Sequence, residues 1–395
     1  MPEREGVRMT KKKHICFIVP NYPTQNDPVY TFVKQLVDAI AKMGYHCSVI
    51  APQSLTKNIF KKKSARPLFW QDCLKEGIRV DVYQPRVLTF SNLKLFGRNI
   101  SATLAQKAVI RCFKQIKSSP ELLYAHFWHS GVTAGLISQK YQRPFFVATG
   151  ESKIWVESLF PRQTIDNALA GINGVICVST KNQKESLELK LSTQDKMIVI
   201  PNAIDPEKFY KIDQMLVRKK LGFKEDDFIV AFMGSFDERK GVMRLSEAMK
   251  AVNQAKVIYI GSGKLIPTGD EILFAGRLPH DQISDYLNAS DVFVLPTLAE
   301  GSSNAILEAM ACGLPIISSD QDFNDDILTS ADSIRIDCMD VNAIAEAINR
   351  LKNDRQLRSR LSASALAHSQ SFHIENRAAR IIDYIENMID EKKEV

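Results

Sequence analysis

Two glutamates, with small and amide side chains between them, follow a strand-like segment near residue 300. The stretch EGSSNAILEAMACGLPII starts at Glu300 and carries Glu308 eight positions later. The run DVFVLP before it predicts a buried strand, and a helix is expected to begin near Ser303, with Ser302 or Ser303 as its cap. Backbone N–H groups of residues 302–305 would then be free to bind an anion or sugar hydroxyls, aided by the positive end of the helix dipole.

The positions of the two carboxylates indicate different ligand groups. Glu308 shares a helix face with Asn304, and a carboxylate there can accept hydrogen bonds from two neighbouring hydroxyls of a diol such as ribose. Glu300 lies in the loop, from which it can reach a group beyond the phosphates. An ordinary capped helix with an exposed glutamate would explain Glu308, but not a glutamate, a glycine and two serines at a strand end. The stretch therefore predicts a site for a phosphorylated ligand that carries sugar hydroxyls.

A basic loop follows another expected strand. In MGSFDERKG, residues 233–241, Gly234 permits a tight turn, and Arg239 and Lys240 place cationic donors where a diphosphate could lie. Basic pairs at helix starts are more often simply solvated, so this loop alone does not establish a site. The run IGSGK, residues 260–264, is neither a Walker A loop nor a full GxGxxG fingerprint, which disfavours kinases and dehydrogenases.

One histidine is a further candidate. The run LLYAHFWHSG places His126 at the end of an expected strand and His129 shortly after it. A lone histidine near an apolar strand is usually structural, but His126 falls where the first half of the chain would meet a cleft. No HExxH motif and no suitable pair of carboxylates accompanies it, so metal binding is not expected.

Parallel sheets must position these residues, because ligands of such sheets bind outside the carboxyl ends of the strands. Short apolar runs alternate with amphipathic helical stretches, which predicts an α/β fold of two doubly wound, Rossmann-like domains. The first series of strands comprises HICFIVP, CSVIAP, LLYAH, PFFVAT, GVICVS and MIVIPN, and the second comprises FIVAFMG, KVIYIGSG, EILFAG, DVFVLP, LPIISS and SIRI.

The boundary between the two series lies in PNAIDPEKFYKIDQ, whose two prolines and lack of periodicity predict an interdomain hinge. A chain of 395 residues is also long enough for two domains. We therefore assign residues 1–205 to an N-terminal, acceptor-side domain and residues 206–371 to a C-terminal, nucleotide-sugar-binding domain. Residues 372–395 place apolar side chains at three- and four-residue steps, which predicts an amphipathic helix that needs a partner surface.

Composition is typical of a globular protein, with 45% hydrophobic and 25% charged residues. No apolar run approaches the roughly 20 residues of a membrane-spanning helix, and the polar start MPEREGVRMTKKK lacks a signal-peptide core. A soluble, cytoplasmic protein is therefore expected. The seven cysteines contain no CxxC pair, which disfavours a zinc site or a disulfide framework.

Charge is unevenly distributed along the chain. Residues 1–200 hold 29 Lys and Arg against 14 Asp and Glu, net +15, and the remainder holds 23 against 31, net −8. The basic half could meet a phosphorylated substrate, lipid head groups or nucleic acid, or the two halves could simply have differently solvated faces. No nucleic-acid-binding module accompanies the basic half, so a nucleic-acid partner is not expected.

Two segments of the basic half suggest peripheral contact with an anionic membrane, and both are interpreted as loops. Residues 59–70 contain Lys61, Lys62, Lys63 and Arg66 together with Phe60, Leu68, Phe69 and Trp70, and residues 87–98 are similar. Basic residues near anionic lipid contribute about 1 kcal/mol each, and aromatic side chains favour the interface. Ordinary loops that pack their apolar residues inward are the alternative.

Five stretches together resemble retaining glycosyltransferases of family 4, which have the GT-B fold. They are EGSSNAILEAMACGLPII, PNAID, GSFDERKG, AHFWHSG and SFHIENRA. The likeness extends from HICFIVPNYP to about residue 385, and its most specific part is the Glu-x7-Glu stretch. The stretch NYPTQNDPVYTFVKQLVDAIAKMGY resembles the opening of the sequences in the branch of the family that builds bacterial surface polysaccharides.

The resemblance implies two facing Rossmann-like domains, with a nucleoside-diphosphate sugar held mainly on the second. Glu308 would hold the donor ribose, and Glu300 and His126 would form the catalytic centre beside the transferred sugar. Lys240 matches the diphosphate-binding lysine of the family, and the final helix would cross back onto the first domain. No metal or resident cofactor is implied. The implied donor-binding residues are Gly234, Ser235, Arg239, Lys240, Ser302, Ser303, Asn304 and Glu308, with Asn21 and Tyr22 on the acceptor side.

Three departures from the family pattern affect contacts with phosphate and acceptor. Ser235 stands where the family usually has an arginine, for which Arg239 could compensate. The usual glycine pair is missing from PNYPTQNDP, on the acceptor side. QDFNDDIL, residues 321–328, stands where the family often shows Gly-Gly before Pro-Glu.

The main hypothesis is transfer of a hexose from a nucleotide sugar to a glycan or lipid-linked glycan, with retention of configuration. Retention is thought to need the acceptor hydroxyl to approach the face that the diphosphate leaves, so Glu300 is not assigned as a nucleophile. A nucleotide-sugar epimerase of the same fold is one alternative. A non-catalytic sugar-nucleotide-binding subunit is another, which the absence of the arginine at Ser235 permits.

Overall fold

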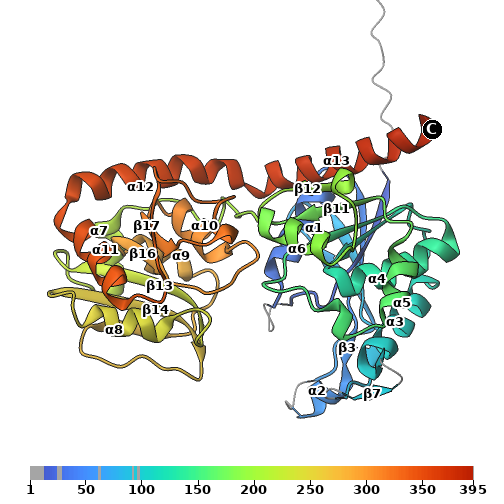
Figure 1. The fold of residues 1–395 in the computed structure, drawn as a ribbon, viewed down its shortest axis with the longest axis horizontal. Helices are drawn as coiled ribbons and strands as arrows, with labels where there is room; N and C mark the ends of the chain where they lie inside the picture. Colours follow the sequence, from blue (N-terminus) through green and yellow to red (C-terminus); the bar gives the residue numbers. More distant parts are fainter. Residues whose placement is uncertain (1–12, 25–28, 61–63, 91–92, 96–97, 395) are drawn as a thin grey trace, which may run out of the picture.

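Two parallel sheets, each with helices on both faces, organise the chain (Figure 1). The computed structural model describes residues 13–24, 29–60, 64–90, 93–95 and 98–394. The first sheet has the strand order β12-β11-β10-β9-β1-β2-β5-β4, and the second has the order β15-β14-β13-β16-β17-β18. The two doubly wound domains expected from the alternation of strands and helices are thereby confirmed.

The first sheet is parallel except for its last strand, β4, which pairs antiparallel with β5. All five residues of β1, β9 and β10 are buried, because helices cover both faces of these strands. Its strands are β1 His14–Ile18, β2 His46–Ile50, β4 Phe69–Cys73, β5 Arg79–Tyr83, β9 Leu122–His126, β10 Phe145–Thr149, β11 Gly174–Cys177 and β12 Met197–Val199. Two small strand pairs stand apart from it, β3 Gln53–Ser54 with β6 Arg86–Val87, and β7 Lys94–Leu95 with β8 Arg98–Asn99.

The helices of this domain connect its strands, and α1 and α4 pack on the sheet. They are α1 Thr31–Lys42, α2 Leu55–Phe60, α3 Ile100–Phe113, α4 Trp128–Tyr141, α5 Arg162–Leu169 and α6 Thr180–Glu188, with short 3-10 turns η1 Val156–Ser158 and η2 Gln194–Lys196.

The second sheet is parallel throughout. Its strands are β13 Phe228–Phe236, β14 Ala255–Gly263, β15 Ile272–Gly276, β16 Val292–Leu295, β17 Ile316–Ser319 and β18 Ser333–Ile336. Its helices are α7 Gln214–Leu221, α8 Val242–Met249, α9 Ile283–Asn288, α10 Asn304–Ala311, α11 Val341–Asn353 and α12 Arg355–Ser369, with the 3-10 turns η3 Asp322–Asn324 and η4 Gln370–Phe372.

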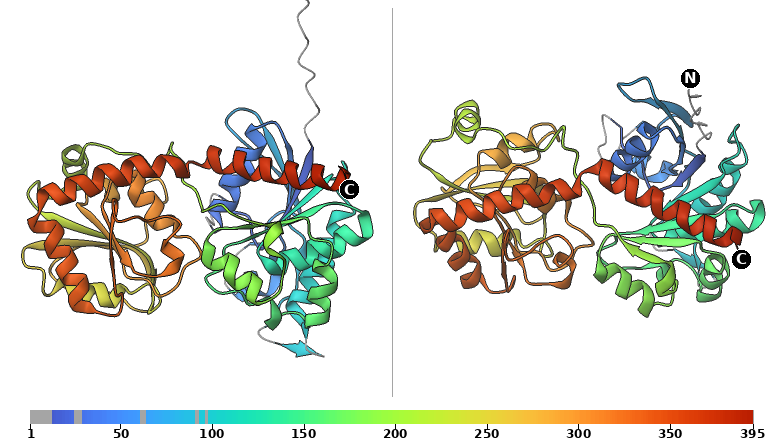
Figure 2. Two further views of the ribbon diagram at one scale, coloured as in Figure 1. Left: turned by 45° about the horizontal axis from the view of Figure 1, so that its top comes forward. Right: turned by 90° about the horizontal axis from the view of Figure 1, so that it is seen from above.

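The last helix, α13 Ile374–Glu394, returns to the N-terminal domain. In both views of Figure 2, the red helices α12 and α13 follow one another along the two domains. Ile374, Ala378 and Ile381 are buried in the core that contains α1, and the Tyr45 hydroxyl donates to Glu386 Oε1 at 2.7 Å. The expected helix that crosses back is therefore present. We retain 1–205 and 206–371, with 372–395 on the first domain, as the proposed division of the chain.

The segment 59–70 differs from the expected loop, because α2 ends at Phe60 and β4 begins at Phe69. The Trp70 side chain is half-buried and its Nε1 donates to Gln84 Oε1 at 3.1 Å, so Trp70 packs against the domain. The loop expected over residues 87–98 is likewise interrupted, by the short strand β7 at Lys94–Leu95. Across the described part of the chain, each helix is too short or too polar to traverse a lipid bilayer.

A histidine pair lies at the amino end of the first sheet. His14 begins β1 and His46 begins β2, and their rings stack with centroids 4.0 Å apart. His14 Nε2 lies 3.0 Å from Ser48 Oγ in a buried position. Burial, and then the neighbouring charge of His46, lower the pKa of His14 from 6.5 to about 4.

His14 should therefore make the folded protein sensitive to acid. The unfolded chain binds a proton at this residue below pH 6.5, whereas the folded chain binds it only near pH 4, so stability is lost between these values. We expect His14 to account for a loss of about 2 kcal/mol between pH 7.5 and pH 5. Urea unfolding at the two pH values should show a smaller loss for His14→Gln than for the wild type. Equal losses would contradict the prediction.

Candidate functional site

A cavity of about 350 Å³ lies between the two domains, and we term it the interdomain cavity. Residues from both domains line it, at the carboxyl ends of β9, β10, β13 and β16. This is where ligands of parallel sheets are expected to bind. Of the predicted site residues, those that line it are His126, Arg239, Lys240, Glu300, Ser302, Ser303 and Asn304.

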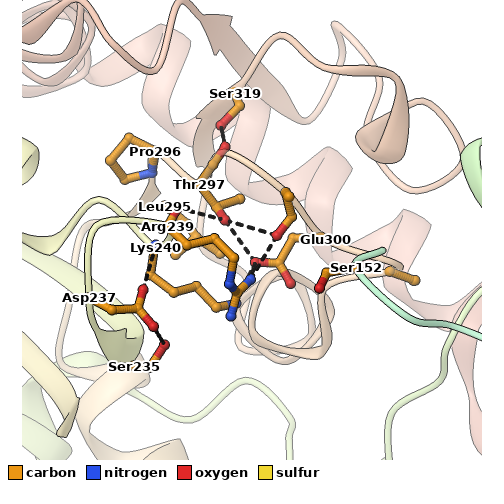
Figure 3. Close-up of polar contacts among 12 residues, drawn as sticks. Ser152, Ser235, Asp237, Arg239, Lys240, Leu295, Pro296, Thr297, Glu300 and Ser319 are labelled. Carbon is orange, nitrogen blue, oxygen red and sulfur yellow. Dashed lines mark hydrogen bonds and ion pairs between the residues drawn. The ribbon is translucent and has the colours of Figure 1, made fainter. Parts of the chain in front are cut away.

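Glu300 is the centre of the polar contacts in this cavity (Figure 3). Its Oε1 accepts hydrogen bonds from Lys240 Nζ at 2.5 Å, Arg239 Nη1 at 3.2 Å and Thr297 Oγ1 at 2.8 Å. Ser319 fixes the position of Thr297 by donating its hydroxyl to the Thr297 carbonyl. One carboxylate therefore occupies two cations that would otherwise be available to the phosphates of a ligand.

The loop after β13 is folded so that Lys240 reaches Glu300. Asp237 Oδ1 accepts from the Lys240 backbone N–H at 2.9 Å, and Asp237 Oδ2 accepts from the Ser235 hydroxyl at 2.6 Å. Gly234 leaves room for the lysine, because a Cβ at this position would lie 3.2 Å from Lys240 Cδ. Ser235 and Gly234 thus support the basic loop and do not line the interdomain cavity. The family usually has an arginine at position 235, but in this chain the guanidinium at the interdomain cavity belongs to Arg239.

Helix α10 begins at Asn304, with Ser303 at the N-cap position. The predicted helix start is confirmed, but the Ser303 side chain makes no capping hydrogen bond. Ser303 Oγ and Asn304 Oδ1 are buried without a hydrogen-bond partner among the described residues. Unpaired buried polar atoms are costly, so both atoms favour a ligand in this cavity. Gly301 is required beside them, since a Cβ there would come within 2.3 Å of the Gly150 carbonyl oxygen.

Glu308 lies one turn further along α10 and does not line the interdomain cavity. Its Oε1 is 3.8 Å from His280 Nε2. Burial raises the pKa of Glu308, and the neighbouring His280 opposes that shift. The ribose contact of Glu308 stays a prediction, and the structure adds His280 as the neighbour of this carboxylate.

Aromatic side chains form the N-terminal wall of the cavity. The ring of His126 lies 5.3 Å from that of Phe32 and 4.9 Å from that of Phe127. Burial, followed by the charges of Arg377 and His129, lowers the pKa of His126 to about 3. His126 is therefore neutral at physiological pH, and it can act as a neutral hydrogen-bonding group but not as a charged acid.

Phe127 has a backbone conformation that side-chain-bearing residues rarely adopt, with φ 72° and ψ 157°. Glu151 stabilises the segment that follows, because its Oε1 accepts from the Trp128 backbone N–H at 3.1 Å and its Oε2 accepts from the Thr149 hydroxyl at 2.7 Å. Strained residues of this kind often occur at binding sites. Neither Phe127 nor Glu151 could be identified from sequence motifs.

Two sets of contacts join the domains next to the cavity. Asn202, in the hinge motif PNAID, donates its side-chain amide to the Ser302 carbonyl at 3.0 Å. Asp326 accepts from the backbone N–H of Thr180 at 2.6 Å and from its hydroxyl at 2.7 Å. Thr180 begins α6 of the first domain, and Asp326 belongs to QDFNDDIL, the stretch that departs from the family pattern. This stretch therefore contributes a contact between the domains.

The two predicted acceptor-side residues lie outside the interdomain cavity. Asn21 lines a second cavity in the N-terminal domain. Tyr22 is fully buried, and its hydroxyl donates to Asp72 Oδ2 at 2.9 Å. The Tyr22 side chain thus has no exposed surface for an acceptor, whereas its carbonyl oxygen accepts from Arg66 Nη1 at 2.7 Å. Among the described residues, no three His, Cys, Asp or Glu side chains group as a metal site.

Two family models match successive parts of the chain. The model described as Glycosyltransferase Family 4 matches residues 29–208. The model described as Glycosyl transferases group 1 matches residues 213–368. The first match covers the strands of the first sheet after β1, and the second match covers all strands of the second sheet, with residues 209–212 of the hinge between the two matches.

Several bacterial proteins with functional names are similar over most of this chain. TuaC of Bacillus subtilis, whose name assigns it to teichuronic acid biosynthesis as a glycosyltransferase, is 28% identical over 366 residues, with 86% of this chain and 90% of TuaC covered. The UDP-Gal:alpha-D-GlcNAc-diphosphoundecaprenol alpha-1,3-galactosyltransferase of Escherichia coli is 24% identical, with 81% of this chain and 89% of that protein covered.

Solved structures share the fold at lower identity. The sucrose-phosphate synthase of Thermosynechococcus elongatus superposes with a TM-score of 0.75 at 19% identity, covering 96% of this chain and 100% of its own. HepE of Anabaena, solved in complex with UDP, gives a TM-score of 0.71 at 17% identity, covering 95% of this chain and 100% of its own. These likenesses show the two-domain GT-B fold.

Proposed function

This chain belongs to glycosyltransferase family 4, and we propose that it is a retaining enzyme that moves a hexose from a nucleoside-diphosphate sugar to a glycan or lipid-linked glycan in surface polysaccharide synthesis. The observation that carries the proposal is the convergence of Lys240, Arg239, Glu300 and the start of α10 on one interdomain cavity. The name of the Escherichia coli relative, which specifies a UDP sugar and a lipid-linked acceptor, supports both substrate classes.

Donor binding would rearrange the contacts of Glu300. The diphosphate would take Lys240 and Arg239 as charge-assisted partners, and the freed carboxylate could then accept hydrogen bonds from hydroxyls of the transferred sugar. The unpaired atoms Ser303 Oγ and Asn304 Oδ1 would gain ligand partners at the same time. His126, neutral and next to Phe127, would face the sugar from the N-terminal domain.

The transfer breaks the bond between the anomeric carbon and the diphosphate oxygen, and forms a bond from that carbon to the acceptor oxygen. Negative charge develops on the leaving diphosphate, and Lys240, Arg239 and the amides at the start of α10 would stabilise it. With retention, the acceptor hydroxyl attacks from the face that the diphosphate leaves, and a phosphate oxygen accepts its proton. Glu300 then stabilises the sugar without a covalent intermediate.

The reaction is proposed to need no metal, because fixed cations can balance the diphosphate. Turnover should therefore be unchanged, within about twofold, after dialysis against EDTA and in buffer without divalent cations. A loss of activity that Mg²⁺ or Mn²⁺ restores would contradict this prediction.

One assay distinguishes transfer from the two alternatives. The protein is incubated with UDP and GDP sugars, with and without lipid-linked and free glycan acceptors, and products are separated by mass spectrometry and chromatography. Product that forms only with an acceptor supports transfer. An altered sugar nucleotide without an acceptor indicates an epimerase, and binding of nucleotide without any turnover indicates a non-catalytic subunit.

Glu308 supplies a separate prediction for donor binding. Glu308→Ala should raise the dissociation constant of the nucleotide roughly tenfold or more, because it removes a charge-assisted hydrogen bond worth about 1.5 to 3 kcal/mol. Calorimetric titration with UDP or GDP checks it. Glu346→Ala, a change on the separate helix α11, is the control. Undiminished affinity in Glu308→Ala would remove the ribose assignment.

We propose that the enzyme acts in the cytoplasm, at the inner face of the membrane where a lipid-linked acceptor is displayed. Lys61, Lys62 and Lys63 lie outside the described residues. Of the apolar residues near them, Phe60 is 83% exposed and Ile59 is 73% exposed. Large exposed apolar side chains beside basic ones favour contact with a lipid surface.

A further inference from the structure

Helix α13 carries a buried cation, Arg377, one turn after the chain crosses from the second domain to the first (Figure 2). Arg377 is only 4% exposed. It lies on the apolar face of the helix, which it shares with Ile374, Ala378 and Ile381 at three- and four-residue steps, and these three residues are buried in the core of the first domain. The pattern of this face would favour an apolar side chain at position 377.

The charge of Arg377 is not balanced by a carboxylate in the part of the chain that the structure describes. Its Nη1 donates to Asn202 Oδ1 at 3.2 Å, and its Nε and Nη2 are buried without a partner there. Another buried arginine, Arg218, shows the usual arrangement: its Nη2 pairs with Asp291 Oδ2 at 2.8 Å, and its Nε and Nη1 donate to backbone carbonyls. A guanidinium stays charged when buried, and leaving it uncompensated is costly. Stability therefore does not explain Arg377.

Asn202, the residue that Arg377 contacts, connects the hinge to the second domain. Its Nδ2 donates to the Ser302 carbonyl at 3.0 Å, and its backbone N–H donates to Ser302 Oγ at 3.3 Å. Asn202 and Ser302 both line the interdomain cavity, and Ser302 comes just before α10. A chain of contacts thus runs from Arg377 through Asn202 to the loop where the donor is proposed to bind.

Arg377 can set the orientation of the Asn202 amide. A guanidinium donates hydrogen bonds and accepts none, so it selects the amide oxygen. The amide nitrogen is then turned toward the Ser302 carbonyl, which can only accept. An apolar side chain at position 377 could not make this distinction, and the amide could rotate until its oxygen faced the carbonyl oxygen of Ser302.

Other contacts hold α13 against the hinge. The Ile204 N–H donates to the Phe372 carbonyl at 2.9 Å, and the Ile374 N–H donates to the Ile204 carbonyl at 2.9 Å. Together with the buried apolar face of α13, these bonds fix the start of the helix without any contribution from the Arg377 side chain. Replacing Arg377 should therefore release Asn202 and leave α13 in place.

We propose that Arg377 is a positioning residue for the transfer, which fixes Asn202, and through it Ser302, in the arrangement that stabilises the leaving diphosphate. The inference rests on the proposed transferase function and adds to it a residue of the crossing helix. The charge of Arg377 also reaches the wall of the interdomain cavity. After burial, it is the largest cause of the lowered pKa of His126.

The first test needs no substrate and uses the full chain. Hydrogen–deuterium exchange, read by mass spectrometry, should be at least threefold faster at residues 300–308 in Arg377→Met and unchanged in α11. The melting temperature of Arg377→Met should not fall, because an apolar side chain of similar size replaces an uncompensated buried charge. Arg380→Met, at an exposed position of the same helix, is the matched control and should resemble the wild type in both measurements.

Steady-state kinetics supply the second test, with release of UDP or GDP from the donor sugar in the presence of the acceptor. In Arg377→Met, kcat should fall at least fivefold, while the KM of the donor should change less than twofold. Asn202→Ala should lower kcat at least as much. Adding Arg377→Met to Asn202→Ala should then change kcat less than twofold, because the two residues act in one chain of contacts. Arg377→Lys, which keeps a cationic donor, should recover part of kcat.

The outcomes separate the role of Arg377 from the transferase function. If the wild type transfers no sugar from any donor, the proposed function is overturned, and unchanged exchange at residues 300–308 would independently overturn the positioning of this loop. If the wild type is active and Arg377→Met has the same kcat, or acts undiminished in the Asn202→Ala background, only the role of Arg377 is overturned. A lower melting temperature with faster exchange in α13 would also overturn it, since Arg377 would then be a structural residue.

Discussion

Replacing Lys240 by alanine is expected to lower kcat by roughly 10²- to 10³-fold, because removal of one fixed donor that stabilises developing charge typically has an effect of this size. Lys240 Nζ lies 2.5 Å from Glu300 Oε1 at the interdomain cavity, and Gly234 leaves space for its stem. In the proposed reaction this ammonium group stabilises the leaving diphosphate, whose charge is greatest in the transition state. Turnover should therefore fall more than the affinity for UDP.

The control is Lys250→Ala. Lys250 follows α8, the same helix that Lys240 precedes, and its side chain forms an exposed ion pair with Glu247 at 2.6 Å. Steady-state kinetics at saturating donor, with UDP titration beside it, should show an unchanged control and a slow Lys240→Ala variant. Lys240→Arg should recover part of the rate. Equal kcat values for Lys240→Ala and the wild type would show that the diphosphate is held elsewhere.

Much of the fold could be predicted because its strands are short and uniformly apolar. β9 and β10 are buried along their whole length, and both are visible in the sequence as LLYAH and PFFVAT. β4 was missed because only alternate residues of FWQDC are half-buried and the strand lies antiparallel at the edge of the sheet. The polarity of such a strand resembles that of a loop.

The C-terminal part of the site was largely predictable, because its residues follow strands of one parallel sheet. β13 and β16 are neighbours in that sheet, and Lys240 and Glu300 follow their carboxyl ends. Because these ends are adjacent, the two side chains meet. Sequence motifs indicated both residues, but not that they pair with each other. Motif matching indicates which residue types suit a donor and carries no information on how those residues pair with each other.

The contacts between the domains could not be predicted, because they depend on how two separately folded sheets meet. Asp326 and Thr180 are 146 positions apart and neither belongs to a periodic pattern. Asn202 was visible in PNAID only as part of a hinge, and its contact with Ser302 depends on how the two domains meet. The unusual backbone of Phe127 likewise results from tertiary packing, since nothing in its residue type favours a positive φ.

The pairing of Glu300 with two cations leads to a prediction with two opposite effects. Glu300→Ala should lower kcat by roughly 10²- to 10³-fold, because the sugar loses a contact that strengthens as the transition state forms. The same change should make UDP bind about fivefold more tightly, since the carboxylate no longer competes with the diphosphate for Lys240 and Arg239. Calorimetry with UDP and steady-state kinetics measure the two effects.

Two further variants show whether competition is the cause. Glu300→Gln keeps the size of the side chain and removes its charge, so it should also tighten UDP binding. In a Lys240→Ala background, removal of Glu300 should tighten UDP binding less, because one of the two competing ion pairs is already absent. Weaker UDP binding in both Glu300 variants would mean that the carboxylate orders the cations for the diphosphate instead of competing for them, and Glu300 would then act in donor binding as well as in transfer.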